Sequence, residues 1–146
     1  MLNVGDKAPD FTLPSTAGEN FALSKNFRGK SCILFFYPKD FTKGCTAEVC
    51  EFRDHFGFLE DLAIPIVGIS RDDLSTHYKF KSTYNLPYHL LSDKSGKVCK
   101  AYDALIPVIG LPKRVTYLLD DSHHIKGIYQ DMFDAKGHIK YMLKKL

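Results

Sequence analysis

The stretch CILFFYPKDFTKGCTAEVC, residues 32–50, passes from an apolar run through a loop into a helical pattern. Its first six residues, 32–37, are continuously apolar, which predicts a strand covered on both faces of its sheet. Apolar residues at helical spacing predict a helix over 47–59: Val49, Phe52, Phe56 and Leu59. A second apolar run, IPIVGIS at 64–70, predicts another buried strand. The order strand, helix, strand indicates an α/β domain.

Weaker patterns extend this centre in both directions. The run RVTYLL at 114–119, then DDSH and IKGIY, predicts a β-hairpin. Shorter strands are expected at 11–13 and 88–91, and further helices at 75–84, 97–102 and 135–146. Ser75 and Asp134 are the expected N-caps. Together these elements predict a single thioredoxin-like domain over 1–146, with a central mixed β-sheet flanked by helices.

Composition excludes several classes of protein. With 146 residues, 45% of them hydrophobic and 25% charged, the chain is an ordinary globular domain. Its net charge of +3 and its scattered lysines do not favour nucleic-acid binding. The apolar runs are too short for a membrane span, and the N-terminus lacks the pattern of a signal or transit peptide. We therefore expect a cytoplasmic protein with reduced thiols, whose four cysteines are not a disulfide framework.

Cys45 follows Gly44 at the start of the helical pattern and begins its apolar stripe. A first-turn position places the thiol near free backbone N–H groups and the positive end of the helix dipole. Both favour the thiolate, which is the nucleophilic form. Thr42 can supply a hydroxyl donor, Gly44 lets a small ligand approach the backbone, and Pro38 would stiffen the loop.

Cys50 lies about 140° around the helix from Cys45, off the apolar stripe. In an intact helix the two Cα atoms would be about 8.6 Å apart, farther than the roughly 7 Å that a disulfide spans. A bond between them requires the first turns to unwind, so the pair is a possible redox switch. The residues alone leave open an inert buried thiol. A metal knuckle is disfavoured because His55 alone supplies no second ligand pair, and the motif C-x-x-C is absent.

With these motifs the chain resembles the Q-type peroxiredoxins, also called the bacterioferritin comigratory protein group. Pro38, Thr42 and Cys45 match the signature P-x-x-x-T-x-x-C, and CTAEVCEFRD resembles the Q-type form with a second cysteine five residues on. The segments VGDKAPDFTLP, IVGISRDD, LLSDKSGKV and RVTYLLDD match further family segments, so the resemblance covers essentially the whole chain.

The resemblance implies a thiol-dependent peroxidase acting on hydrogen peroxide and organic hydroperoxides. Cys45 would be the peroxidatic cysteine, which attacks the O–O bond to give a sulfenic acid and water or an alcohol. Cys50 would be the resolving cysteine, which forms an intramolecular disulfide after local unfolding. Thioredoxin or a similar dithiol would reduce that disulfide, and no metal or organic cofactor is implied.

Four further site residues follow from the same resemblance. Thr42 would hydrogen-bond the bound peroxide, and Pro38 would shield the sulfenic acid. Arg114 would hold the thiolate and the peroxide oxygen, and Glu48 would orient Arg114. Two other functions on this fold remain, a general thiol–disulfide oxidoreductase and a redox sensor. Family members occur as monomers and dimers, so a monomer or weak homodimer is expected.

The remaining notable residues receive individual interpretations. Phe41 stands where an acidic residue is common in the family, and we hypothesise that its ring favours apolar peroxides as substrates. Lys43 stands where a proline is common. Cys32 and Cys99 are expected to be core residues.

The six histidines form no convincing ligand set. His123 and His124 are expected to be solvated in a hairpin turn, and Asp72 with Asp73 is interpreted as a helix start.

Overall fold

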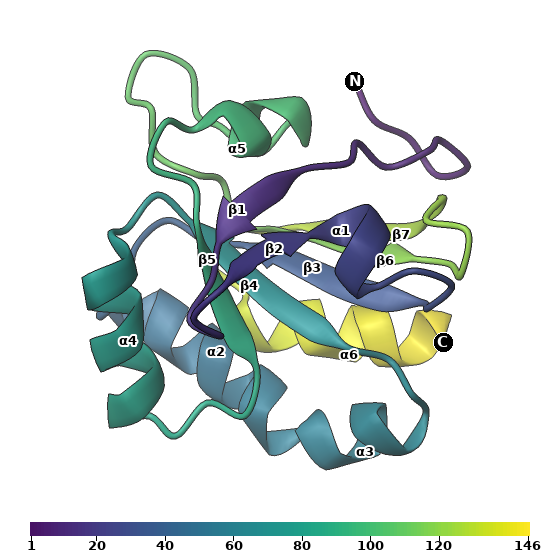
Figure 1. The fold of residues 1–146 in the computed structure, drawn as a ribbon, viewed down its shortest axis with the longest axis horizontal. Helices are drawn as coiled ribbons and strands as arrows, with labels where there is room; N and C mark the ends of the chain where they lie inside the picture. Colours follow the sequence, from purple (N-terminus) through teal and green to yellow (C-terminus); the bar gives the residue numbers. More distant parts are fainter.

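A five-stranded mixed sheet forms the centre of the computed structural model, which describes residues 1–146 (Figure 1). Its strands, in spatial order, are β5 (His89–Ser92), β4 (Ile66–Ser70), β3 (Cys32–Phe36), β6 (Val115–Leu119) and β7 (Ile125–Gln130). The strands β3, β4 and β5 are parallel, and the hairpin β6–β7 joins them antiparallel to β3. Every residue of β3, β4 and β6 is buried, as their continuous apolar character predicted for the first two.

Helices and a small hairpin cover the two faces of this sheet. The helices are α1 (Leu23–Asn26), α2 (Lys43–Asp54), α3 (Phe56–Asp61), α4 (Leu74–Thr83), α5 (Lys97–Ala101) and α6 (Ala135–Lys145). Helices α2, α3, α4 and α6 share one core with the sheet, whereas α1, α5 and the hairpin β1 (Thr12–Pro14)–β2 (Asn20–Ala22) share the other (Figure 1). The predicted α/β class, with a mixed sheet between helices, is confirmed.

Strand β3 supplies side chains to both cores because successive residues of a strand point to opposite faces. Leu34 and Phe36 pack in the core under β1 and β2, and Ile33 and Phe35 pack in the core under α2. The Phe35 ring stacks on Phe52 of α2 with centroids 4.6 Å apart. This stack fixes the helix that carries both cysteines of the motif against the middle of the sheet.

The helix predicted over 47–59 is two helices in the structure. Helix α2 begins earlier, at Lys43, and ends before His55, after which α3 follows in a new direction (Figure 1). The Nδ1 atom of His55 donates to the carbonyl of Glu51, which the backbone N–H of His55 also contacts. A carbonyl oxygen has two lone pairs and can accept from both donors. The apolar spacing continued across this break and therefore did not reveal it.

Two other predictions are corrected. Asp73 rather than Ser75 occupies the N-cap position of α4, without a side-chain capping bond, and the short elements β2 and α1 were not predicted. His123 is buried, not solvated, because α1 and the N-terminal segment cover its turn: Nε2 donates to the carbonyl of Phe27, and Ala8 N–H donates to the carbonyl of His123. No helix combines the length and the apolar character needed to cross a bilayer.

Candidate active site

Cys45 lies in the first turn of α2, where the chain leaves the end of β3 and crosses a six-residue loop, 37–42. Thr42 is the N-cap residue, with extended backbone, and its carbonyl accepts the first helical hydrogen bond, from Thr46. The Cys45 side chain points inward and is fully buried. The predicted first-turn position is therefore where the structure places this thiol.

Arg114 immediately precedes β6, which pairs with β3, so its side chain reaches the start of α2. The guanidinium donates from Nη2 to Cys45 Sγ at 3.3 Å and from Nη1 to Glu48 Oε1 at 2.8 Å. Its Nε donates to the carbonyl of Met132 at 2.9 Å. Three separate acceptors hold the planar group in one orientation, which places a permanently charged donor at the sulfur of Cys45.

Gly44 makes this approach possible. A Cβ atom at this position would stand 3.0 Å from Arg114 Nη2, closer than ordinary side-chain contacts allow. Glycine in the first turn of α2 therefore leaves room for the guanidinium, which a larger residue would have to displace by a few tenths of an ångström.

Glu48 lies one turn after Cys45 on the same side of α2 and is fully buried. Its Oε2 atom has no hydrogen-bond partner, and His138 Nδ1 lies 3.5 Å from it. Because the Nε2 atom of His138 donates to the carbonyl of Asp131, its Nδ1 atom accepts from the hydroxyl of Thr116 in the neutral ring. Burial raises the pKa of Glu48 to about 8, and the attraction of Arg114 offsets this only in part.

The raised pKa of Glu48 predicts a loss of stability as the pH rises from the acidic range to the folded value of about 8. A carboxyl whose pKa is higher in the folded than in the unfolded chain stabilises the fold at low pH, and this contribution is lost as pH rises through the folded value of about 8. Glutamine stays neutral and can still accept from Arg114. We therefore expect the free energy of unfolding of the parent to fall relative to that of Glu48→Gln between pH values of about 5 and 8. Urea unfolding of both proteins across this range measures the difference, and parallel curves would contradict the prediction.

Cys50 is half-buried on α2, off the stripe that Cys45 begins. All four cysteines are free thiols, and α2 is continuous from Lys43 to Asp54. The helical separation of about 8.6 Å between the two Cα atoms therefore applies here. Cys32 and Cys99 are buried in the opposite core, as predicted. Burial raises the pKa of Cys32 to about 12 and that of Cys99 still further, which disfavours their thiolates.

A cavity of about 270 Å³ opens beside the guanidinium of Arg114. Its lining consists of Lys43, Gly44, Ala47, Arg114, Met132, Phe133 and Ala135. Phe133 is 98% exposed, so this rim carries an apolar side chain that sequence reasoning missed. Phe41 is not part of the lining, because its ring packs against Phe80 of α4 at 4.9 Å. The hypothesis that Phe41 selects apolar peroxides at the pocket rim therefore finds no support in its position.

The predicted site residues fall into two groups. Cys45, Glu48 and Arg114 form one hydrogen-bonded unit. Thr42 and Pro38 lie in the preceding loop, where Thr42 is exposed and its hydroxyl donates to the carbonyl of Lys39 at 2.7 Å. Met132 and His138, which complete the surroundings of Arg114 and Glu48, come from the segment after β7 and carried no motif that would have revealed them.

Comparisons with known proteins agree with this geometry. The profile of the AhpC/TSA family matches residues 4–128. The chain is 39% identical to the bcp protein of Coxiella burnetii, which is named as a peroxiredoxin, over 99% of both chains. It is 42% identical to the chloroplastic peroxiredoxin Q of Suaeda salsa over 99% of this chain and 68% of that protein.

Solved structures give the same result. The crystal structure of peroxidoxin BcpB from Mycobacterium tuberculosis superposes with a TM-score of 0.92 at 31% identity, covering 99% of this chain and 96% of that one. The PrxQ of Xylella fastidiosa superposes with a TM-score of 0.86 at 25% identity, with the same coverage. The family profile, the full-length relatives and these structures together show that the chain belongs to the AhpC/TSA family, as a peroxiredoxin of the Q type.

Proposed function

We propose that this peroxiredoxin is a thiol-dependent peroxidase in which Cys45 is the peroxidatic cysteine. The observation that carries the proposal is the hydrogen bond from Arg114 Nη2 to Cys45 Sγ in a buried first helical turn. The thiolate attacks one oxygen of a hydroperoxide ROOH, the O–O bond breaks, and the sulfur becomes a sulfenic acid. The departing RO⁻ takes a proton and leaves as water or an alcohol.

Arg114 assists the attack in two ways. Its charge stabilises the thiolate before the reaction, and its fixed donors stabilise negative charge on the peroxide oxygens as the O–O bond lengthens. Glu48 and the carbonyl of Met132 hold the guanidinium in this orientation. Because the donors are held before the peroxide arrives, little reorganisation is needed during the reaction.

Thr42 and Pro38 act from the loop. Thr42 donates to Lys39 in the absence of substrate, and rotation of its hydroxyl lets it hydrogen-bond a bound peroxide instead. Pro38 is half-buried between the end of β3 and the start of the loop, where its ring limits the access of water to the sulfenic acid.

Cys50 resolves the sulfenic acid after the first turns of α2 unwind. Its thiolate attacks the sulfur of Cys45, a disulfide forms, and the sulfenic oxygen leaves as water. Burial raises the pKa of Cys50 in the folded helix, so unwinding also exposes it to solvent and favours its ionised form. A dithiol such as thioredoxin then reduces the disulfide by exchange and returns both cysteines to thiols.

A coupled turnover assay tests this function. Hydrogen peroxide or cumene hydroperoxide is supplied with thioredoxin, thioredoxin reductase and NADPH, and NADPH consumption is followed over many equivalents of peroxide. Sustained consumption is expected. A single equivalent followed by arrest would favour the redox-sensor function, and faster reduction of insulin than of peroxide would favour the general oxidoreductase.

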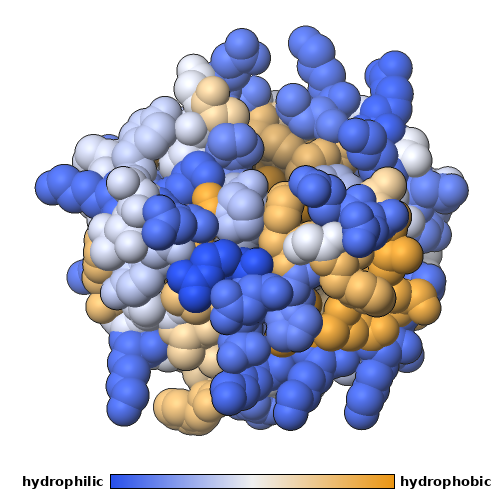
Figure 2. Space-filling view, turned by 90° about the horizontal axis from the view of Figure 1, so that it is seen from below, coloured by the Kyte–Doolittle hydropathy of each residue, from blue (hydrophilic) through white to orange (hydrophobic).

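The surroundings of the site agree with a monomer or a weak homodimer. The face seen in Figure 2 is mostly hydrophilic, with its apolar area gathered toward one side, and two apolar side chains, Phe58 of α3 and Leu62 at its C-cap, are exposed. Sedimentation at several concentrations tests the oligomeric state. A cytoplasmic location remains a prediction from the sequence, and the similar proteins include one named as chloroplastic.

A further inference from the structure

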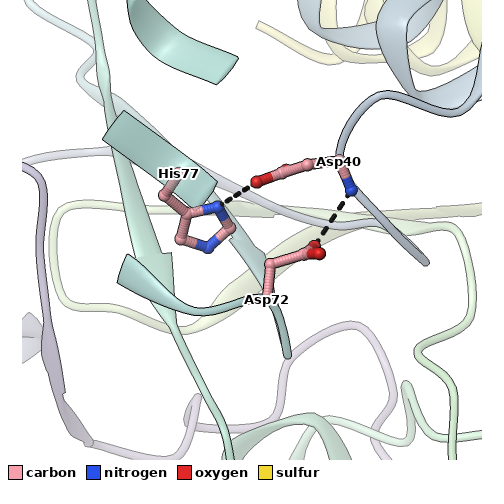
Figure 3. A group of neighbouring side chains, drawn as sticks. All are labelled: Asp40, Asp72 and His77. Atoms are coloured by element: carbon pink, nitrogen blue, oxygen red, sulfur yellow. Dashed lines mark hydrogen bonds and ion pairs between the residues drawn. The ribbon is translucent and has the colours of Figure 1, made fainter. Parts of the chain in front are cut away.

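Asp40 and His77 form a fully buried pair behind the loop that precedes α2 (Figure 3). His77 comes from the middle of α4, and its Nδ1 lies 2.6 Å from Asp40 Oδ2. The other oxygen of Asp40 accepts from the hydroxyl of Tyr37, also at 2.6 Å. The backbone N–H of Asp40 donates to Asp72 Oδ2 at 2.9 Å. Three segments thus converge on a single loop residue.

The hydrogen bonds of this cluster favour a positioning role over metal binding. Asp40, Asp72 and His77 offer ligand atoms within 4.8 Å of one another. However, His77 Nε2 faces the carbonyl of Leu91 at 2.9 Å and must donate to it, so the link from Nδ1 to Asp40 also contains a proton. Asp72 Oδ2 additionally accepts from the hydroxyl of Ser70. A metal ion would have to break several of these buried bonds, each costly to lose.

Helix α4 holds the loop at two consecutive residues. Besides the contact of His77 with Asp40, the ring of Phe41 packs on Phe80 at 4.9 Å. Phe41 has a φ of 65°, in the left-handed region that residues other than glycine rarely adopt. Such a conformation persists only where surrounding contacts impose it. The contacts with α4 therefore keep the loop in a shape that it would not hold alone.

The same helix is tied to the far end of α2. The carbonyl of Tyr84, at the C-cap of α4, accepts from Arg53 Nη1 at 2.8 Å. Helix α4 therefore contacts the chain on both sides of the segment that contains Cys45 and Cys50: the loop before it and Arg53 after it. A hydrogen bond that fixes the loop also opposes the unwinding that brings these cysteines together.

We propose that His77 is a positioning residue that acts through Asp40 to hold the peroxide-binding conformation of the loop. The contact keeps Thr42 and the first turn of α2 in place while Cys45 reacts with peroxide. Its loss shifts the population toward the unwound form in which Cys50 reaches Cys45. The inference rests on the proposed peroxidase cycle and adds a residue that sets the balance between its two steps.

Two substitutions at one position separate the contacts of His77. In His77→Gln, the amide nitrogen can replace Nε2 and keep the bond to Leu91, whereas the bond to Asp40 is lost. In His77→Asn, the amide nitrogen can replace Nδ1 and keep the bond to Asp40, whereas the bond to Leu91 is lost. We therefore expect the ratio of the rate of disulfide formation to the rate of sulfenic acid formation to change only in His77→Gln.

Rapid mixing with hydrogen peroxide, acid quenching and intact-mass analysis give the rates of sulfenic acid and disulfide formation separately. In His77→Gln we expect disulfide formation to accelerate by up to about tenfold, the change in population expected when one buried hydrogen bond is lost. Sulfenic acid formation is expected to slow by a smaller factor, because the ordered loop is less populated. Tyr37→Phe removes only the hydroxyl that binds Asp40, and it should change both rates in the same directions by less.

Two controls distinguish positioning from a loss of stability. Lys79→Ala changes an exposed residue of α4 and should leave both rates unchanged. Val67→Ala, in the opposite core, lowers the free energy of unfolding without touching the loop and should leave the ratio of the rates unchanged.

The proposal would be overturned if the ratio of disulfide formation to sulfenic acid formation were the same in the parent, His77→Gln and Tyr37→Phe. It would also be overturned if this ratio changed equally in His77→Asn and His77→Gln. If His77→Gln does not fold, Tyr37→Phe decides alone. Absence of sulfenic acid and disulfide in the parent would instead refute the peroxidase cycle itself.

Discussion

Cys45→Ser is expected to abolish peroxide turnover. A serine hydroxyl is a far weaker nucleophile than a cysteine thiol, and the sulfur that it replaces is the atom that accepts from Arg114 Nη2. Because the sulfur is itself the reactant, the remaining donors have no reaction to assist without it, so the rate should fall by roughly 10⁴-fold or more, to the uncatalysed background. The coupled NADPH assay at saturating thioredoxin measures this loss.

Cys32→Ala is the matched control for this substitution. Cys32 is also a fully buried thiol, but it lies in β3 on the face opposite α2. It should keep the turnover of the parent after correction for any loss of folded protein. Activity that survives in Cys45→Ser, or disappears equally in Cys32→Ala, would show that another thiol carries the reaction.

Arg114→Lys is expected to slow the reaction with peroxide by roughly 10²- to 10³-fold, even though the positive charge is kept. The guanidinium serves Cys45, Glu48 and the carbonyl of Met132 through three different nitrogens. A lysine ammonium is a single point of charge and cannot reproduce this planar arrangement. The fully buried Glu48 would also lose a fixed donor, so the local hydrogen bonds would rearrange.

The measurement is the second-order rate of sulfenic acid formation, with the thiolate fraction followed by its ultraviolet absorbance. Both quantities should fall in Arg114→Lys. Arg28→Lys is a matched control, because Arg28 is exposed in the turn after α1. An unchanged rate in Arg114→Lys would mean that positive charge alone, and not the fixed set of donors, activates Cys45.

Much of the fold could be predicted because its central strands are continuously apolar. The runs around Ile33 and Val67 became β3 and β4, and the hairpin β6–β7 followed from its turn residues. The break at His55 could not be predicted, because apolar spacing continues from Phe52 to Leu59 across it. The elements β2 and α1 are too short to establish a period of their own.

The residues of the candidate site could be predicted from the sequence only where they belong to a local motif. Pro38, Thr42 and Cys45 lie within eight positions of one another, and the sequence signature covers all three. His138 and Met132 approach Glu48 and Arg114 through tertiary folding alone.

The cluster around Asp40 shows the same limit. His77 appears as an ordinary helical residue in the sequence, and its contact joins residues 37 positions apart. Asp72 was interpreted as part of a helix start, whereas its carboxylate accepts from the backbone of Asp40. Pairings of this kind depend on how α4 packs beside the loop, which no local pattern encodes.

Intact mass and thiol count after one equivalent of hydrogen peroxide test the central claim most directly, on the parent, Cys45→Ser and Cys50→Ser. We expect the parent to lose two thiols without forming a covalent dimer. Cys50→Ser should stop at the sulfenic acid or a more oxidised product, and Cys45→Ser should not react. An intramolecular disulfide in Cys50→Ser would assign resolution to Cys32 or Cys99, and an unreactive parent would contradict the peroxidase account altogether.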